Sequence, residues 1–553
     1  MSYQSEMKKR SFPAIGILYS ITVFLSAPAP YAAVSQTPPM GWNSYDCLNH
    51  SATEAIVKSN TDYMAENLKQ YGWEYICIDW AWYFTGNTTG SPNQDNSYNP
   101  KLVLDEYGRM LPDPAKFPSS ANGQGFKPLA EYIHGKGLKF GFHLMRGIPR
   151  QAVNANTPIL GAASKAKDIY TQNSPCAWLN LMWGLDMTKP DAQKYFNSLF
   201  ELYASWGLDF VKVDDLINPY GSPAFRQSEV EGYRKAIDAC GRDIVFSTSP
   251  GATPLANATQ IKQFANQWRM ANDLWDNWDN LNAMFDLASS WNPHAGPGHW
   301  PDADMIPIGK LSKRGPNGNE RFSNLTADEK YTMMTLWIIA RSPLIWGGNL
   351  VENRAEELKL MQNAEAMAVN QNSAGSKPVV TGNTPVWCAD VPGTTIKYVA
   401  VFNRGGSAAN VTIDFSKVGV TTGSDTLRDV WAQNNVGVFS GSYAVNLASH
   451  QSKLFRLTPP GATMVTPRKA ANDRNFAKSA GTVRMSHGKI IVMPEDMNGK
   501  FSLMVHMSNG RLVAGKEQCA GITSVPVRSK GIYIVTINRG GHRERKMIPL
   551  YGP

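Results

Sequence analysis

Short apolar runs recur eight times between residues 39 and 347, and polar, Gly-rich or acidic residues follow each run. Segments with helical spacing separate the runs; one covers residues 53–70 before Gly72, and another covers residues 228–239 before Gly241. Runs of this length, ended by turn residues, are typical of buried strands. The eight predicted strands lie at residues 39–44, 73–79, 138–143, 209–214, 244–249, 267–273, 299–305 and 342–347.

This alternation of strands and helices predicts an α/β fold, a (β/α)8 TIM barrel with parallel strands inside a ring of helices. We place the barrel at residues 36–373. Enzymes with this fold carry their active sites at the carboxyl ends of the strands. The residues at those ends are therefore the first place to look for chemistry.

Six successive strand ends carry polar side chains, and most of these are acids. Because the strand ends converge on one mouth, we expect these side chains to surround a single site. One aspartate in such a position can equally cap a loop or a turn, but a ring of them predicts an active site. The residues are Asp79, His143, Asp214 with Asp215, Ser249, Asp273, and Asp302 with Asp304.

The fourth strand carries a lysine and an aspartate on one face. Side chains alternate along a strand, so Lys212 and Asp214 point one way while Val211 and Val213 point the other. With the valines against the helices, the lysine and the aspartate face the barrel interior. A buried lysine favours the ionised form of a neighbouring carboxylate, and a nucleophilic carboxylate must be ionised. The alternative is an ion pair that only stabilises the core.

The sixth strand is expected to end at Asp273, with Arg269 four residues earlier on the same face. Trp268, Trp275 and Trp278 crowd this segment, and apolar surroundings favour the protonated form of an acid. One ionised carboxylate and one protonated carboxyl group are what glycoside hydrolysis requires. The sequence therefore predicts Asp214 and Asp273 as a catalytic pair.

A metal-dependent hydrolase is the weaker interpretation of two such aspartates. The chain has only 9 His residues, and no pair of them has metal-ligand spacing. Its 6 Cys residues are scattered without a CxxC pair, so the sequence favours neither a zinc site nor a dense disulfide framework.

The net charge of +9 is concentrated at one end of the chain. Residues 464–553 contain 15 Lys or Arg and 5 Asp or Glu, while the remainder is close to neutral. A basic protein can bind nucleic acid or a membrane surface. Because the excess lies in a tail, we expect no nucleic-acid partner.

Residues 1–33 are predicted to be a signal peptide. Basic residues at positions 8–10 precede an apolar segment at residues 15–25, and small residues favour cleavage near Ala32 or Ala33. A retained membrane anchor is the alternative, although the apolar segment is short for a membrane span. We expect an exported protein that is secreted, bound to the cell surface or periplasmic.

The helical spacing stops after residue 373. Alternating segments predict an antiparallel β-sandwich at residues 374–458, which we expect to stabilise the barrel without a site of its own. A linker at residues 459–480 precedes a small β module at residues 481–553. The segments expected as strands are residues 397–402, 409–415 and 452–457 in the sandwich, and 489–493, 501–505 and 531–537 in the module.

Six motifs in the same order make the chain resemble glycoside hydrolase family 27, the family of α-galactosidases and α-N-acetylgalactosaminidases. The likeness runs from about Thr37 to Leu350, and the β-sandwich fits it too. The motifs are residues 39–44 (PMGWNS), 75–79 (YICID), 211–214 (VKVD), Trp268 and Arg269 with Asp273, 301–305 (PDADM) and 341–343 (RSP).

The resemblance implies that Asp214 is the nucleophile and Asp273 the acid/base. It also implies that four further residues bind the sugar in subsite −1, namely Lys212, Asp79, Arg269 and Asp304. No cofactor is implied. The expected substrates are α-linked galactosides, oligosaccharides or polysaccharide side chains.

Three departures from the family pattern concern the substrate. Galactose-specific members carry two consecutive acids after the second strand, whereas Trp80 follows Asp79 here. The family's tyrosine on the third strand is His143. At the fifth strand, small residues, Ser249 and Ala252, stand where galactose-specific members have a glutamate and a bulky residue. We therefore expect Trp80, His143 and Ser249 to shape the sugar pocket.

Together these features predict a retaining, exo-acting α-galactosidase. The alternatives are an α-N-acetylgalactosaminidase or another activity of the family, such as a β-L-arabinopyranosidase or an isomaltodextran-cleaving enzyme. A non-catalytic sugar-binding protein with the same barrel fold should have lost Asp214 or Asp273, and both are present. A transglycosylase would share every residue named.

The C-terminal module resembles the sorting domains of type IX secretion. The likeness rests on the run at residues 531–535 and on the basic patch at residues 543–546. It implies secretion machinery as a partner. A small carbohydrate-binding module is the competing interpretation.

Overall fold

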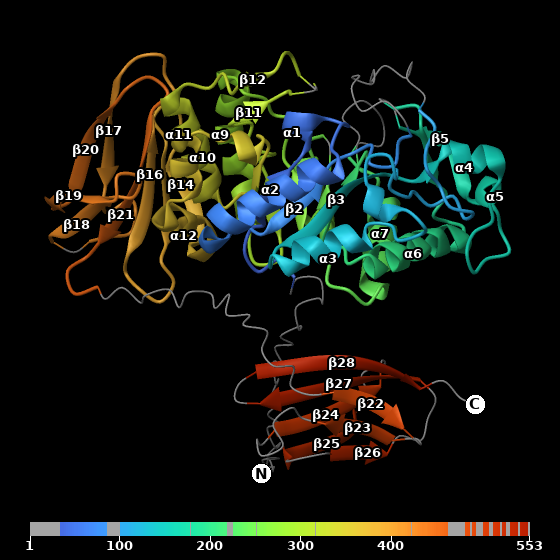
Figure 1. Ribbon diagram of the computed structural model, residues 1–553. Coiled ribbons are helices and arrows are strands. Elements are labelled where there is room, and N and C mark those ends of the chain that lie inside the picture. The colour runs from blue at the N-terminus through green and yellow to red at the C-terminus, as the bar shows by residue number, and fades with distance from the viewer. Residues whose placement is uncertain are drawn as a thin grey trace, which may run out of the picture. The chain divides into compact units, whose positions relative to one another are not determined.

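The structure is a computed structural model that describes two compact units (Figure 1). The first unit, drawn in blue to orange, holds the residues described before 463, and the second, drawn in red, holds seven strands between 482 and 550. The predicted signal peptide at residues 1–33 and most of the predicted linker lie outside the described residues. In the first unit these are residues 34–85, 100–176, 179–217, 225–249, 251–313, 315, 317–421 and 423–462.

Eight parallel strands form a curled sheet in the order β10-β9-β8-β7-β3-β2-β1-β13. The sheet closes between its first and last strands. Ile306, which follows β10, forms a parallel bridge with Trp346 of β13, and its N–H donates to the Ile345 carbonyl (2.7 Å). The predicted TIM barrel is confirmed. The strands are β1 (Met40–Asn43), β2 (Tyr75–Ile78), β3 (Lys139–Met145), β7 (Phe210–Asp214), β8 (Val245–Thr248), β9 (Gln267–Arg269), β10 (Trp300–Asp302) and β13 (Leu344–Trp346).

All eight predicted strands occur, but the predictions for the sixth and seventh extended too far, since β10 stops at Asp302 and leaves Asp304 in the following loop. Strand β9 stops at Arg269, so Asp273 lies in the loop that follows. In the segment after the strand, Asn272 and Asp273 are exposed to solvent. The acid/base candidate is therefore carried by a loop and not by the barrel wall.

A small antiparallel sheet, which the sequence pattern did not reveal, is inserted after β3. Its order is β4-β6-β5. Its strands are β4 (Ile148–Pro149), β5 (Tyr170–Pro175) and β6 (Met182–Leu185). A short hairpin, β11 (Lys310–Leu311) with β12 (Arg321–Phe322), follows β10.

Helices connect the barrel strands. The sequence explains the start of α10, because Thr326 and Glu329 form a reciprocal capping box that satisfies two backbone N–H groups. The helices are α1 (Tyr45–Leu48), α2 (Glu54–Asn67), α3 (Lys127–Gly135), α4 (Arg150–Ala155), α5 (Ala166–Ile169), α6 (Pro190–Ser205), α7 (Gln227–Ala239), α8 (Ala258–Phe264), α9 (Trp278–Trp291), α10 (Ala327–Ala340), α11 (Ala355–Met361) and α12 (Ala364–Asn372). Short 3-10 helices lie at Lys69–Tyr71, Pro118–Ser120, Leu255–Asn257, Asn292–His294 and Leu350–Glu352.

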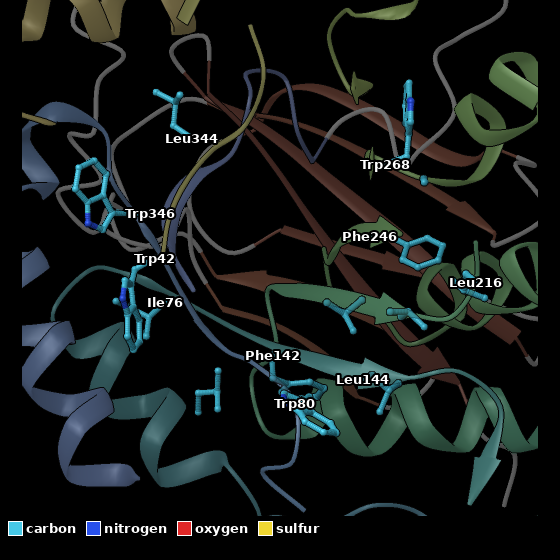
Figure 2. Close-up of a cluster of buried hydrophobic side chains, with 14 of the residues drawn as sticks. Trp42, Ile76, Trp80, Phe142, Leu144, Leu216, Phe246, Trp268, Leu344 and Trp346 are labelled. Carbon is cyan, nitrogen blue, oxygen red and sulfur yellow. The ribbon is translucent and has the colours of Figure 1, made fainter. Parts of the chain in front are cut away.

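A continuous hydrophobic core lies between the sheet and its helices (Figure 2). As predicted, Val211 and Val213 belong to this core and are fully buried. Trp80, drawn in Figure 2, belongs to it as well. Burying one large apolar side chain stabilises the fold by about 1.5–3 kcal/mol. Because many such side chains pack on the outer face of the sheet, this packing fixes the positions of the strand ends.

A β-sandwich packs against the barrel within the first unit. Its six-stranded sheet has the order β14-β15-β16-β21-β18-β19, and a two-stranded sheet pairs β17 with β20. His450 of the sandwich stacks on Trp278 of α9 (3.6 Å between ring centroids), and Arg404 pairs with Asp286 (3.0 Å). The strands are β14 (Ala374–Val380), β15 (Val386–Asp390), β16 (Lys397–Phe402), β17 (Ala409–Asp414), β18 (Asp425–Asp429), β19 (Asn434–Phe439), β20 (Ser442–Leu447) and β21 (Ser452–Thr458).

The second unit consists of two antiparallel sheets, with orders β22-β23-β26 and β25-β24-β27-β28. The strands expected from the sequence at residues 489–493, 501–505 and 531–537 are all present in it. Its strands are β22 (Thr482–Ser486), β23 (Lys489–Met493), β24 (Phe501–Met507), β25 (Leu512–Cys519), β26 (Thr523–Pro526), β27 (Gly531–Arg539) and β28 (His542–Leu550). In the described parts of the chain, no helix is long and apolar enough to span a membrane.

Candidate active site

The carboxyl ends of the barrel strands bring the predicted residues into three contacting groups. Asp79 meets Lys212, His143 meets Asp214, and Arg269 meets both Asp273 and Asp304. Ser249 follows β8, and its N–H donates to the Val213 carbonyl (2.9 Å), so it lies beside the strand that carries Asp214. The site therefore gathers residues from β2, β3, β7, β8, β9 and β10.

Asp214 ends β7 and is buried. Its Oδ2 lies 2.9 Å from Nε2 of His143, whereas no described residue hydrogen-bonds its Oδ1. Burial raises the pKa of Asp214, and the bond to His143 and the charge of Lys212 only partly oppose this effect. The expectation of a low pKa for Asp214 was wrong, because burial outweighs the lowering by His143 and Lys212. The Lys212 ammonium itself lies closest to another carboxylate.

That carboxylate is Asp79. The Lys212 ammonium lies 3.3 Å from Oδ2 of Asp79, and the Asn43 side-chain amide donates to the same oxygen (2.8 Å). Burial opposes ionisation of Asp79, but the charge of Lys212 and the hydrogen bonds that the carboxylate accepts outweigh it and lower its pKa. The site thus holds a fixed anion at the end of β2, which can accept hydrogen bonds from sugar hydroxyls.

Asp273 differs from the other acids because its side chain is 51% exposed. Its Oδ1 lies 3.3 Å from Nη2 of Arg269. The apolar enclosure predicted for Asp273 was wrong. Trp268 is buried in the core, and Trp278 stacks on His450 of the β-sandwich.

Arg269 and Asp304 form a buried ion pair. Nη2 of Arg269 lies 2.7 Å from Oδ2 of Asp304, and both side chains are nearly inaccessible. Burial raises the pKa of Asp304 to about 6, with Arg269 opposing the shift. The same carboxylate accepts the N–H of Leu274 (2.8 Å), so this pair anchors the loop that carries Asp273.

Arg269 has two further side-chain nitrogens, Nε and Nη1, that are buried and make no hydrogen bond within the described part of the chain. The Ser249 hydroxyl is in the same condition. A buried donor without a partner costs free energy, so these groups are suited to receive a polar ligand. Ala252 is exposed, so it does not belong to this buried group.

Trp80 is also almost fully buried. Its indole N–H donates to the Asn49 side chain (2.8 Å), and its ring packs edge-on against Phe84. Its backbone N–H donates to Oδ1 of Asp79 (2.9 Å). The backbone of Trp80 therefore holds the Asp79 carboxylate, while its indole belongs to the hydrophobic core and offers no acceptor such as a second acid would.

Asp215 and Asp302, also expected at the mouth, have structural roles. Asp215 pairs with Arg146 (2.7 Å), which also pairs with Glu229. This network holds Asp215 at a φ of 61°, a left-handed conformation that is uncommon for a non-glycine residue. Asp302 accepts the side-chain amide of Gln267 (2.7 Å) inside the barrel.

Sequence reasoning missed three residues of this region. Asn43 holds Asp79, and its place in the first-strand motif could have indicated this. Asp46 is buried, and burial and then the charge of Asp304 raise its pKa well above the usual range. Tyr45 meets Trp275 of the Asp273 loop at 6.4 Å between ring centroids, a contact between distant segments that no sequence pattern signals.

No group of three or more His, Cys, Asp or Glu side chains among the described residues has the arrangement of a metal site. The groups that are present are carboxylates, cations and hydrogen-bond donors. Their chemistry is that of proton transfer, nucleophilic attack and hydroxyl recognition.

Comparison with known proteins identifies the family. The crystal structure of a family 27 β-L-arabinopyranosidase from Geobacillus stearothermophilus is 44% identical, with a TM-score of 0.75, and the match covers 79% of this chain and 99% of that one. The chain belongs to glycoside hydrolase family 27. A variant of the same enzyme in complex with arabinose is 45% identical (TM-score 0.75), covering 78% of this chain and 100% of that one.

Further matches cover both parts of the first unit. The family model for α-galactosidase A matches residues 185–372, and the model for the α-galactosidase C-terminal β-sandwich domain matches residues 381–457. The α-galactosidase of Cyamopsis tetragonoloba is 29% identical over 433 residues, which are 77% of this chain and 87% of that protein. The predictions of family 27, of a glycoside hydrolase and of α-glycosidase activity are confirmed.

Proposed function

We propose that this enzyme releases terminal α-D-galactopyranosyl groups from oligosaccharides or polysaccharide side chains by a retaining double displacement. The observation that carries the proposal is the pair of unlike carboxylates at one mouth. Asp214 is buried on a strand, whereas Asp273 is half exposed on a loop, and the charge of Asp273 acts on Asp214. Such a pair can divide nucleophilic attack and proton transfer between its members.

In the first step, the Asp214 carboxylate attacks the anomeric carbon. The bond from that carbon to the leaving oxygen breaks, and Asp273 gives its proton to the departing oxygen. In the second step, Asp273 takes a proton from water, the water oxygen attacks the anomeric carbon, and the Asp214 carboxylate leaves. For this chemistry we expect the two carboxyl groups to lie about 5–5.5 Å apart in a sugar complex.

The remaining polar groups support sugar recognition. Asp79 is held ionised by Lys212 and can accept hydrogen bonds from hydroxyls. The free nitrogens of Arg269 and the Ser249 hydroxyl can donate hydrogen bonds near the strand ends of β8 and β9. We assign these residues, with Asp304 as the partner of Arg269, to the subsite that holds the released sugar.

A second substrate is favoured by Trp80. β-L-Arabinopyranose has the ring configuration of α-D-galactopyranose but lacks the hydroxymethyl group. Trp80 follows Asp79 where galactose-specific members carry a second acid, and its buried indole cannot accept a hydrogen bond from such a group. The chain is 44% identical to a β-L-arabinopyranosidase and 29% identical to the α-galactosidase of Cyamopsis tetragonoloba. This difference also favours a β-L-arabinopyranoside as the second substrate. An α-N-acetylgalactosaminide is the further alternative suggested by the small residues Ser249 and Ala252.

The test is a panel of 4-nitrophenyl glycosides of α-D-galactose, β-L-arabinopyranose, α-N-acetylgalactosamine and α-D-glucose. We expect turnover of the first two and a first-formed sugar product that retains its anomeric configuration by NMR. Inverted product would contradict the mechanism. Activity confined to the glucoside would contradict the proposed substrate class.

We also propose that the enzyme is exported. The proposal rests on the sequence of residues 1–33 and on the likeness of the C-terminal module to type IX sorting domains. Cell fractionation and the N-terminal sequence of the mature protein test it. A cytoplasmic protein that keeps its first residues would contradict export.

A further inference from the structure

The two oxygens of the Asp214 carboxylate have unlike surroundings. Oδ2 lies 2.9 Å from Nε2 of His143, and Oδ1 is buried but makes no hydrogen bond within the described residues. A carboxylate in water has two equivalent oxygens. Here the neighbouring strand makes them different.

The barrel wall fixes this contact. His143 lies on β3 and is paired in register with Lys212 of β7, two residue pairs before the Met145–Asp214 pair that ends this strand pairing. The imidazole is buried, and the indole N–H of Trp82 donates to the His143 carbonyl (2.7 Å). The ring therefore cannot turn away from Asp214 without breaking the sheet or its packing.

The chemistry of the two groups assigns the proton. An ionised carboxylate only accepts hydrogen bonds, so Nε2 of His143 carries the hydrogen. Nδ1 is buried and makes no hydrogen bond with any described residue. A proton on Nδ1 would be a buried donor without an acceptor, and the neutral Nε2–H tautomer avoids that cost.

We propose that His143 is a catalytic hydrogen-bond donor that holds Oδ2 of the Asp214 nucleophile and assists the departure of Asp214 from the glycosyl-enzyme. The inference rests on the proposed retaining mechanism.

The donor affects the two steps differently. In the first step the carboxylate gives up its negative charge, so a hydrogen bond to Oδ2 stabilises the free enzyme at least as much as the transition state. In the second step the carboxylate is the leaving group and regains its charge. A donor fixed at Oδ2 stabilises that developing charge without reorganisation. His143 should therefore accelerate release of the sugar from Asp214 more than its capture.

Replacement of His143 by Phe removes the donor and keeps a buried ring, and replacement by Gln restores an N–H donor. With an aryl glycoside that has a good leaving group, we expect His143→Phe to lower kcat by about tenfold or more. KM should fall in parallel, because the glycosyl-enzyme accumulates, while kcat/KM stays within about threefold of the wild type. Rapid-quench measurements should show a burst of released phenol close to one per enzyme.

Two variants separate this role from a structural one. His143→Gln should recover much of kcat and lose the burst, because its amide can donate to Oδ2. Met145→Leu changes buried volume on the same strand without touching the donor, and volume-conserving swaps are well tolerated. Met145→Leu should give the wild-type burst amplitude and the wild-type kcat/KM. Thermal unfolding of each variant reports on the fold.

The proposal is overturned if His143→Phe or His143→Gln lowers kcat/KM as much as kcat, with no burst. That result would mean that His143 acts on the first step or only on the fold. Failure of the retaining mechanism itself looks different, since the wild-type enzyme would then give inverted product and no variant would form a covalent intermediate.

Discussion

The two proposed catalytic carboxylates are held in opposite ways. Asp214 stands on a barrel strand, its side chain is 10% exposed, and His143 from the next strand fixes one of its oxygens. Asp273 stands on a loop, its side chain is 51% exposed, and the hydrogen bond to its carboxylate from the described residues comes from Arg269 at 3.3 Å. The nucleophile is thus built into the barrel, whereas the acid/base is presented from outside it.

This difference matches what each group must do. The nucleophile meets the same anomeric carbon in every substrate, so a rigid position lowers the entropic cost of attack. The acid/base meets the leaving group, which varies between substrates, and an arriving aglycone can cover its exposed carboxyl group. The loop is nevertheless anchored, because Leu274 donates to Asp304 and Arg269 pairs with the same carboxylate.

The largest expected effect separates the two aspartates. We expect Asp214→Ala to abolish turnover of all substrates. Asp273→Ala should lower kcat by about 10²–10⁴ for poor leaving groups and by much less for dinitrophenyl glycosides, which need no proton. Steady-state rates with two leaving groups measure the difference.

Azide sharpens the same comparison. In Asp214→Ala it should attack from the side of the missing carboxylate and give a glycosyl azide of inverted configuration. In Asp273→Ala it should attack the glycosyl-enzyme and give a retained azide. The assignment of the two roles is contradicted if the products are exchanged.

The second effect is on stability. Removing one partner of a buried ion pair costs about 3–5 kcal/mol, because the other charge stays buried. We expect Arg269→Met to lower the free energy of unfolding by this amount at pH 7, measured in urea. At pH 5 the loss should be smaller, since Asp304, whose pKa is about 6 with Arg269 present, then takes up a proton. An equal loss at both pH values would contradict the buried pair.

The third effect concerns Trp80, on the rigid side of the site. We expect Trp80→Asp to raise the preference for the α-galactoside over the β-L-arabinopyranoside by roughly 10-fold to 150-fold, the equivalent of one charged hydrogen bond of about 1.5–3 kcal/mol. The ratio of kcat/KM for the two substrates measures this preference and does not depend on how much enzyme is folded. Trp80→Phe, which adds no acceptor, is the control. A wild-type preference of about a thousandfold for the galactoside would contradict this account of Trp80.

The fourth effect is on pH dependence. Burial raises the pKa of Asp304 to about 6 and also raises that of Asp214, and both groups act as carboxylates. As the pH falls through about 6, Asp304 takes up a proton, and Asp214 is protonated at a higher pH than an ordinary aspartate, so kcat/KM should decline on the acidic side by about tenfold per pH unit or more. Asp304→Asn should change the shape of this acidic limb. A flat profile down to pH 4 would contradict the raised pKa values.

The smallest effect is expected outside both regions. The seven strands after residue 481 form their own compact unit. Truncation after residue 462 should therefore leave kcat/KM on aryl glycosides unchanged and alter only where the protein accumulates. Loss of barrel stability on truncation would show that the module is part of the enzyme.

The strand-borne half of the site could be predicted from sequence, and the loop-borne half only in part. Alternation places Asp214 and Lys212 inside the barrel, and strand ends give Asp79 and Asp304. The partners could not be predicted, because they depend on the register between strands. The pairing of β3 with β7 puts His143 on Asp214, and it leaves Lys212 for Asp79.

The end of β9 shows a different limit. The apolar and aromatic pattern at residues 267–273 fits a longer strand, but the sheet stops at Arg269. The aromatic residues nearby have tertiary roles, since Trp268 packs in the core and Trp278 stacks on His450 of the distant β-sandwich. Local composition therefore suggested an apolar enclosure for Asp273 that the fold does not build.

The central claim is that Asp214 forms a covalent bond with the sugar. A 5-fluoro glycosyl fluoride of the preferred sugar should slow release and trap the intermediate. We expect the intact mass to rise by one fluoroglycosyl group and peptide mapping to place that group on Asp214. Attachment to another residue, or full turnover to inverted product with no adduct, would contradict the account.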